Sequence, residues 1–271
     1  MTAAPTLVKI GGELLERPDG LRALAGVLAR RAAAGPLVVV HGGGKEINAA
    51  LTRAGLVSRQ VDGIRVTDAP TLEVVVGVLA GLVNTRLVAA ITAAGGRAVG
   101  LSGVDAALAP VAPAAPHRTS DGRTVSLGLV GEPIDAGPPA LLVDLLAAGY
   151  VPVIASVSAT ADGTIHNVNA DTLAGHLAAR LRAARWIVAG ATPGVLDEAG
   201  RTIPRLDEAA TAALLRHGVA SAGMIAKLRA CRAALAAGVA EVVLVDGREP
   251  EALEAALSAS RADLPATRMV A

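Results

Sequence analysis

The chain repeats one hydrophobic pattern: a short run of apolar, often β-branched residues ends in glycine or a small polar residue, and an alanine-rich stretch follows. Unbroken apolar runs that alternate with helical stretches predict an α/β fold with a mostly parallel sheet covered on both faces. Ligands bind such sheets beyond the carboxyl ends of the strands, where the glycines fall here. The runs with this form are residues 6–12, 36–44, 97–103, 150–157, 185–194 and 241–247.

Other stretches depart from this pattern. Asp-Gly turns between short extended runs predict β-hairpins over residues 117–133 and 159–171. Residues 106–116 are too rich in proline for a helix and predict an edge strand or a loop. Residues 70–94 form the longest predicted helix, and apolar residues nearly surround it. We therefore expect this helix to be buried on more than one side, in the core or at a subunit interface.

Composition limits the classes of protein. The 271 residues suit one large domain or one domain with two lobes, and the core must be aliphatic because the chain has no Phe, one Trp and one Tyr. A net charge of +1 and few aromatic residues argue against a nucleic-acid partner. The lone Cys231 argues against disulfides and cysteine metal clusters. Without a signal sequence, and with apolar runs that break before 18 residues, we expect a cytoplasmic protein outside the membrane.

The glycines at residues 42–44, directly after His41, are the most informative feature. A Walker loop would need Ser or Thr at Glu46, and a dinucleotide fingerprint would need glycine at Ile47, so neither motif fits. Free backbone N–H groups at a helix start still form a ready anion site. The loop therefore predicts an anionic ligand, with a plain tight turn between strand and helix as the alternative.

Two lysines suit the same interpretation. Lys9 lies inside an apolar strand just before two glycines, and a buried lysine needs an anionic partner such as a phosphate. A lysine on an edge or surface strand is the alternative. Lys227 lies in a predicted helix that follows Gly223, where a solvated lysine is the commoner case.

Polar residues gather at two further places. Asn167, Asn169 and Asp171 alternate, so in an extended run they share one face and predict a polar site. The alternative is a helix N-cap at Asp171 with two solvated asparagines. Arg65 could hold a carboxylate with both arms of its guanidinium, or form a surface ion pair.

Taken in order, short strings along almost the whole chain resemble the amino acid kinase family, in the branch that acts on N-acetyl-L-glutamate. They include "VKIGG", "VVHGGGKEI", "DGIRVTD", "NVNAD", "TPGVLD", "SAGMIAKL" and "TRMVA". The resemblance implies a three-layer αβα sandwich. It implies an N-terminal lobe, residues 1–175, for acceptor binding and dimerisation, and a C-terminal lobe, residues 176–271, for ATP. The implied reaction is ATP-dependent phosphorylation of the γ-carboxylate of N-acetyl-L-glutamate, in arginine biosynthesis.

The resemblance also implies residue roles. A carboxylate nucleophile is already ionised, so the reaction needs alignment and charge neutralisation rather than a general base. The implied catalytic residues are Lys9, Lys227, Asp171, Gly12 and Gly44. The implied acceptor site is Gly43, Gly44, Arg65, Asn167 and Asn169. The implied ATP site is Lys9, Gly11, Ala191, Thr192, Gly194, Leu196, Gly223, Met224 and Lys227. Magnesium would bind through the nucleotide phosphates, with no protein metal ligand expected.

One position departs from the family pattern. Ala191 stands where relatives usually carry an acidic residue in the nucleotide site, which predicts weaker or less selective nucleotide binding unless another group replaces it. Two other functions stay open: a kinase for carrier-linked aminoadipate or glutamate, and a non-catalytic amino-acid sensor on the same fold. We expect a homodimer formed through the helix over residues 70–94.

Overall fold

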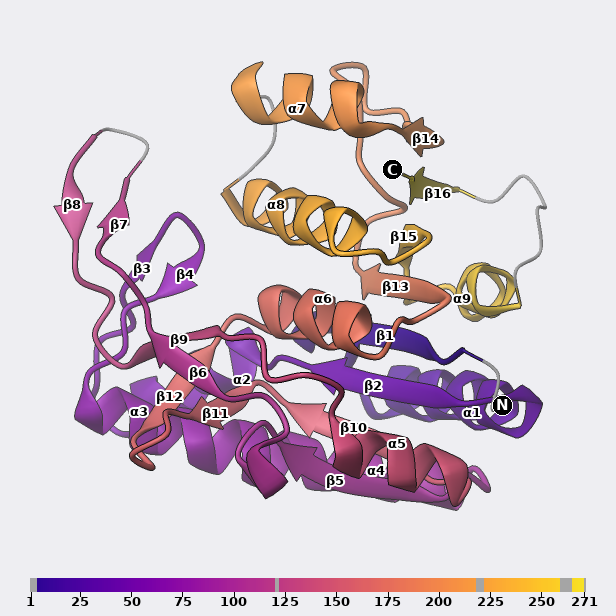
Figure 1. The fold of residues 1–271 in the computed structure, drawn as a ribbon, viewed down its shortest axis with the longest axis horizontal. Helices are drawn as coiled ribbons and strands as arrows, with labels where there is room; N and C mark the ends of the chain where they lie inside the picture. Colours follow the sequence, from indigo (N-terminus) through magenta and orange to yellow (C-terminus); the bar gives the residue numbers. More distant parts are fainter. Residues whose placement is uncertain (1–3, 120–121, 218–221, 259–264, 271) are drawn as a thin grey trace.

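The computed structural model describes residues 4–119, 122–217, 222–258 and 265–270, and an eight-stranded sheet lies at its centre (Figure 1). The strand order is β14-β16-β15-β13-β1-β2-β10-β5, and only the β15–β16 pair is antiparallel. The strands are β1 (Thr6–Ile10), β2 (Leu37–His41), β5 (Ala98–Ser102), β10 (Val151–Ala155), β13 (Arg185–Gly190), β14 (Arg205–Leu206), β15 (Val242–Asp246) and β16 (Ala266–Met269). Every predicted apolar run contains one of these strands, so that part of the prediction is confirmed.

Helices cover both faces of the sheet, which confirms the expected three-layer αβα sandwich (Figure 1). One face carries α1 (Pro18–Ala34), α4 (Asn84–Ala93) and α9 (Pro250–Leu257). The other face carries α5 (Ala140–Ala147), α6 (Ala170–Arg180) and α8 (Ala222–Ala236). An outer helix, α7 (Glu208–His217), packs on α8.

Alternation along each central strand divides the core into two layers. Leu7 of β1 packs toward α6 and α8, whereas Val8 packs toward α1 and α9, and both are fully buried. Trp186, the only tryptophan, lies under α6. A Cβ on Gly175 of that helix would lie 3.0 Å from the indole, so the glycine makes room for the ring. Strands covered on both faces explain the unbroken apolar runs.

A smaller sheet and two hairpins stand beside the carboxyl ends of β1 and β2. The smaller sheet has the order β11 (Val157–Ala159), β12 (Ile165–Val168), β9 (Val130–Pro133) and β6 (Val111–Pro113). The hairpins are β3 (Gln60–Val61) with β4 (Ile64–Arg65), and β7 (His117–Arg118) with β8 (Thr124–Val125). Figure 1 shows both hairpins on the side of the molecule away from the N-terminus.

The hairpin predictions fare differently. β11 and β12 pair antiparallel, which confirms the second hairpin, although it begins at Val157. The first prediction, over residues 117–133, is wrong beyond Val125, because β9 pairs with β12 and β6 and not with β7. β6 lies at the edge of its sheet, as the prolines of residues 106–116 predicted.

The long apolar helix is continuous but not uniform. It runs through α3 (Ala69–Val76), a π-helical segment (Gly77–Val83) and α4. By length and composition, Ala69–Ala93 could cross a membrane, with a mean hydropathy of 2.1, contrary to the expectation that every apolar run is too short. A core helix meets the same criteria, and this helix packs on β5, β10 and α2 (Gly44–Arg53). Its few polar residues, such as Thr71 and Asn84, do not interrupt it.

The two expected lobes share the central sheet. β1 lies between β2 of the N-terminal part and β13 of the C-terminal part, with parallel ladders to both. The expected boundary at residue 175 lies inside α6. The direction of the chain crossovers reverses on either side of β1, and such a switch point is where open α/β sheets bind ligands.

Candidate active site

The glycine loops after β1 and β2 contact each other directly. The N–H of Gly11 donates to the carbonyl of Ala189 at 2.9 Å, and a 3₁₀ turn (Gly12–Leu14) follows. A Cβ on Gly12 would lie 2.9 Å from the Cα of Gly43. Because that neighbour is backbone, any side chain at residue 12 would push the loops apart. The two loops therefore form one surface at the switch point of the sheet.

Helix α2 begins in this surface at Gly44. Its first hydrogen bond joins the N–H of Ile47 to the carbonyl of Gly43, so the preceding N–H groups have no acceptor within the helix. A Cβ on Gly44 would meet no atom within 4 Å. The fold itself therefore does not require glycine there, and the open space before the helix suits an anion.

A buried ion pair stands next to the loops. The Nζ of Lys9 lies 3.0 Å from Oδ1 of Asp171 in the first turn of α6, and both residues are less than a tenth exposed. Burial alone would raise the pKa of Asp171, but the positive charges of Lys9 and then Lys227 outweigh it, so the pKa lies below its ordinary value. An ionised Asp171 thus pairs with the ammonium group of Lys9 on β1 and lies near enough to Lys227 on α8 for that charge to lower its pKa.

Lys227 reaches the same end of the sheet. Its Nζ would lie 3.5 Å from a Cβ placed on Gly190, the last residue of β13. The structure therefore brings together Lys9, Asp171 and Lys227, which the sequence could only nominate separately. Gly11 and Gly12 lie beside them at the end of β1.

Two carboxylates near the loops were missed by the sequence analysis. Oε1 of Glu13 would lie 3.4 Å from a Cβ on Gly190, which places it in the same space as Lys227. Oε2 of Glu46 is buried without a hydrogen bond among the described residues, and burial raises the pKa of this carboxyl. An acidic residue directly after a glycine loop was the available signal, and it is a weak one.

His41 was also not predicted as a functional residue. It is buried and supports the glycine loop from the side of the protein core. Its Nδ1–H donates to the carbonyl of Gly42 at 3.1 Å, and its Nε2 accepts from Nδ2 of Asn84 at 3.0 Å. Asn84 also donates to the carbonyl of Val153 at 2.9 Å. Burial lowers the pKa of His41 to about 4, so the ring is neutral and fixes the loop without adding charge.

Arg65 lies on the other side of the loop surface, at the end of the β3–β4 hairpin. It is 7% exposed, and its guanidinium donates to Ser58 Oγ and Asn48 Oδ1, both at 2.7 Å. No carboxylate pairs with it among the described residues, and burial lowers its pKa. A buried guanidinium without a counter-charge suits a ligand carboxylate, which contradicts the alternative of a surface ion pair.

The asparagines have different environments. Asn167 of β12 donates to Thr67 Oγ1 at 3.1 Å, close to Arg65 in the chain. Asn169 is the N-cap of α6, and its Oδ1 accepts from the N–H groups of Asp171 and Thr172. The prediction that Asn167, Asn169 and Asp171 share one strand face is wrong, because the helix begins at Ala170. The N-cap alternative is correct in kind, but the cap is Asn169.

The loop after β13 contains four of the residues predicted to contact the nucleotide, Ala191, Thr192, Gly194 and Leu196. Arg248 donates to the carbonyl of Ala191 at 2.9 Å and also pairs with Asp246, the residue opposite Gly190 in β15. A carboxylate therefore does lie beside the position where Ala191 lacks one. Thr192 and Leu196 are exposed.

Gly194 is explained by packing alone. It has a φ of +134°, and a Cβ there would collide with Thr267, whose hydroxyl accepts from the N–H of Val195. Gly223 and Met224 lie in the first turn of α8, which begins at Ala222 and not after Gly223 as expected. A Cβ on Gly223 would meet no atom within 4 Å, so this turn is open to a ligand.

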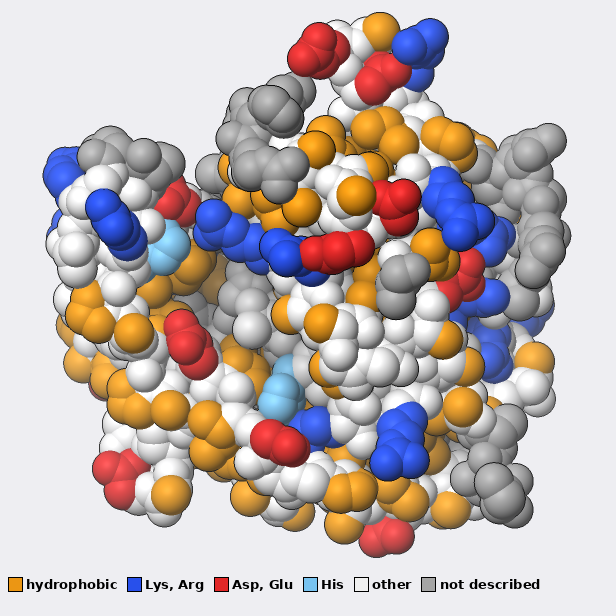
Figure 2. Space-filling view, turned by 45° about the horizontal axis from the view of Figure 1, so that its top comes forward, with side chains coloured by type: hydrophobic (Ala, Val, Ile, Leu, Met, Phe, Trp, Pro, Cys, Tyr) orange, Lys and Arg blue, Asp and Glu red, His pale blue; other side chains and the backbone are white. Residues whose placement is uncertain are grey.

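Figure 2 shows the molecular surface hollowed between the part that carries the β3–β4 and β7–β8 hairpins and the part that carries α8. The glycine loops and the lysines lie at this end of the sheet. In the described part of the chain, no group of three or more His, Cys, Asp or Glu side chains is placed to hold a metal ion.

Comparison with known proteins identifies the class of this site. Residues 5–246 match the model of the amino acid kinase family, and the chain belongs to that family. It is 43% identical to the acetylglutamate kinase of Sphingopyxis alaskensis over 253 residues, which cover 91% of this chain and 83% of that protein. It is 42% identical to the acetylglutamate kinase of Methanopyrus kandleri over 245 residues, covering 89% of this chain and 94% of that one.

Solved structures agree on the fold. The N-acetylglutamate synthase of Neisseria gonorrhoeae, complexed with coenzyme A and N-acetyl-glutamate, matches with a TM-score of 0.84 and 22% identity. The match covers 100% of this chain and 60% of the synthase. A Giardia carbamate kinase matches with a TM-score of 0.68 and 14% identity, over 98% of each chain.

Proposed function

We propose that the chain transfers the γ-phosphoryl group of ATP to the γ-carboxylate of N-acetyl-L-glutamate, giving N-acetyl-L-glutamyl 5-phosphate and ADP in arginine biosynthesis. Relatives named acetylglutamate kinase, 41–43% identical over about 90% of the chain, support this activity. The observation that carries the proposal is the buried Asp171, which pairs with Lys9 and lies near Lys227, beside open backbone N–H groups.

The arrangement suits phosphoryl transfer to a carboxylate. The nucleophile is ionised at neutral pH, so the protein supplies positive charge and alignment in place of a base. Lys9 on β1 and Lys227 on α8 would neutralise the oxygens of the moving phosphoryl group. The N–H groups of Gly12 and Gly44 would donate to the same oxygens, where preorganised donors act most strongly.

The two substrates would occupy opposite sides of the loop surface. Gly43 and Gly44 would hold the γ-carboxylate of the acceptor. Arg65 would pair with its α-carboxylate, with Asn167 and Asn169 nearby. The nucleotide would lie on the C-terminal side against the backbone of Gly11, Ala191, Thr192, Gly194, Leu196, Gly223 and Met224. Magnesium would enter with the nucleotide, since it keeps several waters and uses few protein ligands.

We also propose a cytoplasmic homodimer, with the helix of α3 and α4 at the interface. Leu82 in its π-helical segment is 42% exposed, and β5 beside it is an edge strand with half-buried residues. An exposed apolar helix next to an open strand edge is a surface that a second copy could cover.

The test is the release of ADP from ATP when free N-acetyl-L-glutamate is added, measured with a coupled assay. We expect turnover that requires both substrates and is lost in Lys227→Ala. ADP release only with a carrier-linked aminoadipate or glutamate would instead support the carrier-dependent kinase. Binding of N-acetyl-L-glutamate without any ADP release would support the amino-acid sensor.

A further inference from the structure

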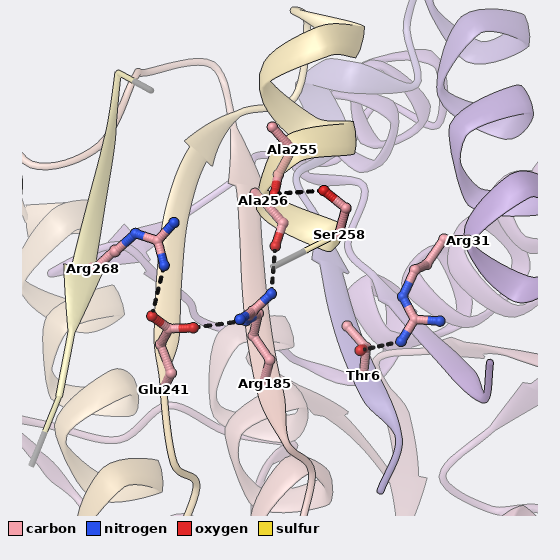
Figure 3. Close-up of polar contacts among 8 residues, drawn as sticks. All are labelled: Thr6, Arg31, Arg185, Glu241, Ala255, Ala256, Ser258 and Arg268. Atoms are coloured by element: carbon pink, nitrogen blue, oxygen red, sulfur yellow. Dashed lines mark hydrogen bonds and ion pairs between the residues drawn. The ribbon is translucent and has the colours of Figure 1, made fainter. Parts of the chain in front are cut away.

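An open cavity of about 480 Å³ lies at the opposite end of the sheet from the glycine loops. It is bounded by the start of β1, the start of β13, and the last turns of α1 and α9. Arg30, Arg31, Arg185 and Glu254 line it, together with Thr6 and Ser258. Figure 3 shows Arg31 and Arg185 on either side of the first residue of β1, with the end of α9 above them.

The arginines of this cavity differ in how their charges are balanced. Arg30 is neutralised, because its Nε and Nη2 both donate to the carboxylate of Glu254, at 3.0 and 2.9 Å. Arg185 donates to Glu241 at 2.7 Å, but the same carboxylate also pairs with Arg268 at 3.0 Å. Glu241 therefore bridges Arg185 and Arg268, and Arg185 also donates to the carbonyl of Ala256 at 3.1 Å.

Arg31 has no carboxylate partner among the described residues. Its Nη2 donates to the hydroxyl of Thr6 at 2.7 Å, and it is only partly exposed. Burial and then the positive charge of Arg185 lower the pKa of Arg31. Thr6 is the direct neighbour of Arg185 across the β1–β13 ladder, so the hydroxyl that binds Arg31 lies on the strand next to Arg185.

Two like charges in a shared cavity repel each other unless an anion lies between them. A guanidinium presents donors in a fixed planar fork that matches the oxygens of phosphate and carboxylate groups. We propose that this cavity binds a small multivalent oxyanion, a phosphate or a polycarboxylate, between Arg31 and Arg185. It is a site separate from the glycine loops, and its ligand would stabilise the first residues of β1 and β13.

The test measures thermal unfolding by the fluorescence of Trp186, with inorganic phosphate, citrate or sodium chloride at matched ionic strength. A ligand of the folded state raises Tm with its concentration and saturates according to its Kd. We expect such a rise with phosphate or citrate beyond that with sodium chloride, and the stronger of the two identifies the ligand chemistry. An equal effect of sodium chloride would overturn the proposal, since screening of the repulsion would then explain it.

Variants assign the binding to this cavity. Arg31→Gln should weaken the anion about tenfold or more, and Thr6→Val should weaken it while keeping all charges and the side-chain shape. Arg53→Gln, which removes another arginine from the last turn of a helix, is the matched control and should bind as the wild type does. Lys9→Ala should also keep the effect. If Lys9→Ala loses it and Arg31→Gln keeps it, the anion binds at the glycine loops and the proposal is wrong.

Discussion

At the scale of single residues, the charge balance around Asp171 makes the strongest prediction. Lys9→Ala or Lys227→Ala should lower kcat on the order of a hundredfold or more, because each removes a preorganised donor to the phosphoryl group. The KM values should change less. Lys45→Ala is the matched control, since its exposed ammonium pairs with Glu16 at 2.8 Å. Near-normal kcat in either of the first two variants would show that the substituted lysine has no role in phosphoryl transfer.

Arg65 gives a prediction for the acceptor side. Arg65→Lys should raise the KM for N-acetyl-L-glutamate, because a planar fork is replaced by a point charge that cannot reach both Ser58 and Asn48 as well as a ligand carboxylate. The KM for ATP should stay near the wild-type value. Steady-state kinetics with each substrate varied in turn measures both. An effect confined to ATP would place Arg65 outside the acceptor site.

The buried His41 predicts a pH dependence of stability. Its pKa is about 4 in the folded protein against 6.5 ordinarily, so the unfolded chain binds more protons between these values. The stabilisation is complete above pH 6.5 and is lost as the pH falls toward 4, by about 3 kcal/mol in all. Urea unfolding at several pH values, compared with His41→Gln, isolates this contribution. Parallel curves for the two proteins would show that His41 does not titrate in this way.

Sequence alone nominated some of these residues and missed others for a physical reason. Lys9 was nominated because it lies inside an apolar strand just before two glycines, although a lysine in a strand is by itself weak evidence of a site. The partners of His41, by contrast, are Gly42 next to it and Asn84 and Val153 far along the chain. Asn169 was assigned to a strand face because capping depends on where the helix begins, and the expected cap at Asp171 lies two residues beyond the observed one.

At the scale of elements, the π-helical segment accounts for the placement of Asn84. Such segments interrupt the regular spacing of a helix, and here the first residue after it turns into the core toward His41 and Val153. Asn84→Ala should lower the free energy of unfolding by about 1–3 kcal/mol, because it removes the amide that donates to two buried acceptors, Nε2 of His41 and the carbonyl of Val153. Thr85→Ala, an exposed neighbour, is the control and should change it little. Equal stability of the two variants, measured by urea unfolding, would show that these hydrogen bonds contribute nothing.

The strands of the central sheet were predictable, and the smaller sheet was not. A strand buried on both faces is marked along its whole length by apolar residues, as in β1 and β2. β9 contains Gly131, Glu132 and Pro133, and its pairing with β12 and β6 depends on contacts between distant segments. Local turn signals therefore placed the β7–β8 hairpin correctly but extended it too far.

At the scale of the whole molecule, the proposed dimer predicts a mass in solution of twice the 26.9 kDa of the chain. Leu82→Glu should shift the protein toward the monomer, because it places a charge in an apolar contact. Light scattering coupled to size exclusion measures both. Val57→Glu, at an apolar residue that is 80% exposed outside this helix, is the control and should leave the mass unchanged. A monomeric wild type would overturn the dimer.

The position of β1 has a mechanical consequence. Its backbone hydrogen-bonds to β2 on one side and to β13 on the other, so the proposed acceptor half and the proposed nucleotide half are joined along a whole strand. Adjacent strands of a sheet are ordinarily twisted by about 20° relative to each other. A change of this twist would let the two halves approach each other. These shared strands are the connection through which a twist of one half would reach the other. The glycine loops lie at one end of these strands, and Thr6 and Arg185 at the other end border the arginine-lined cavity. An anion held there would restrict the twisting of the strands that join the two proposed substrate sites.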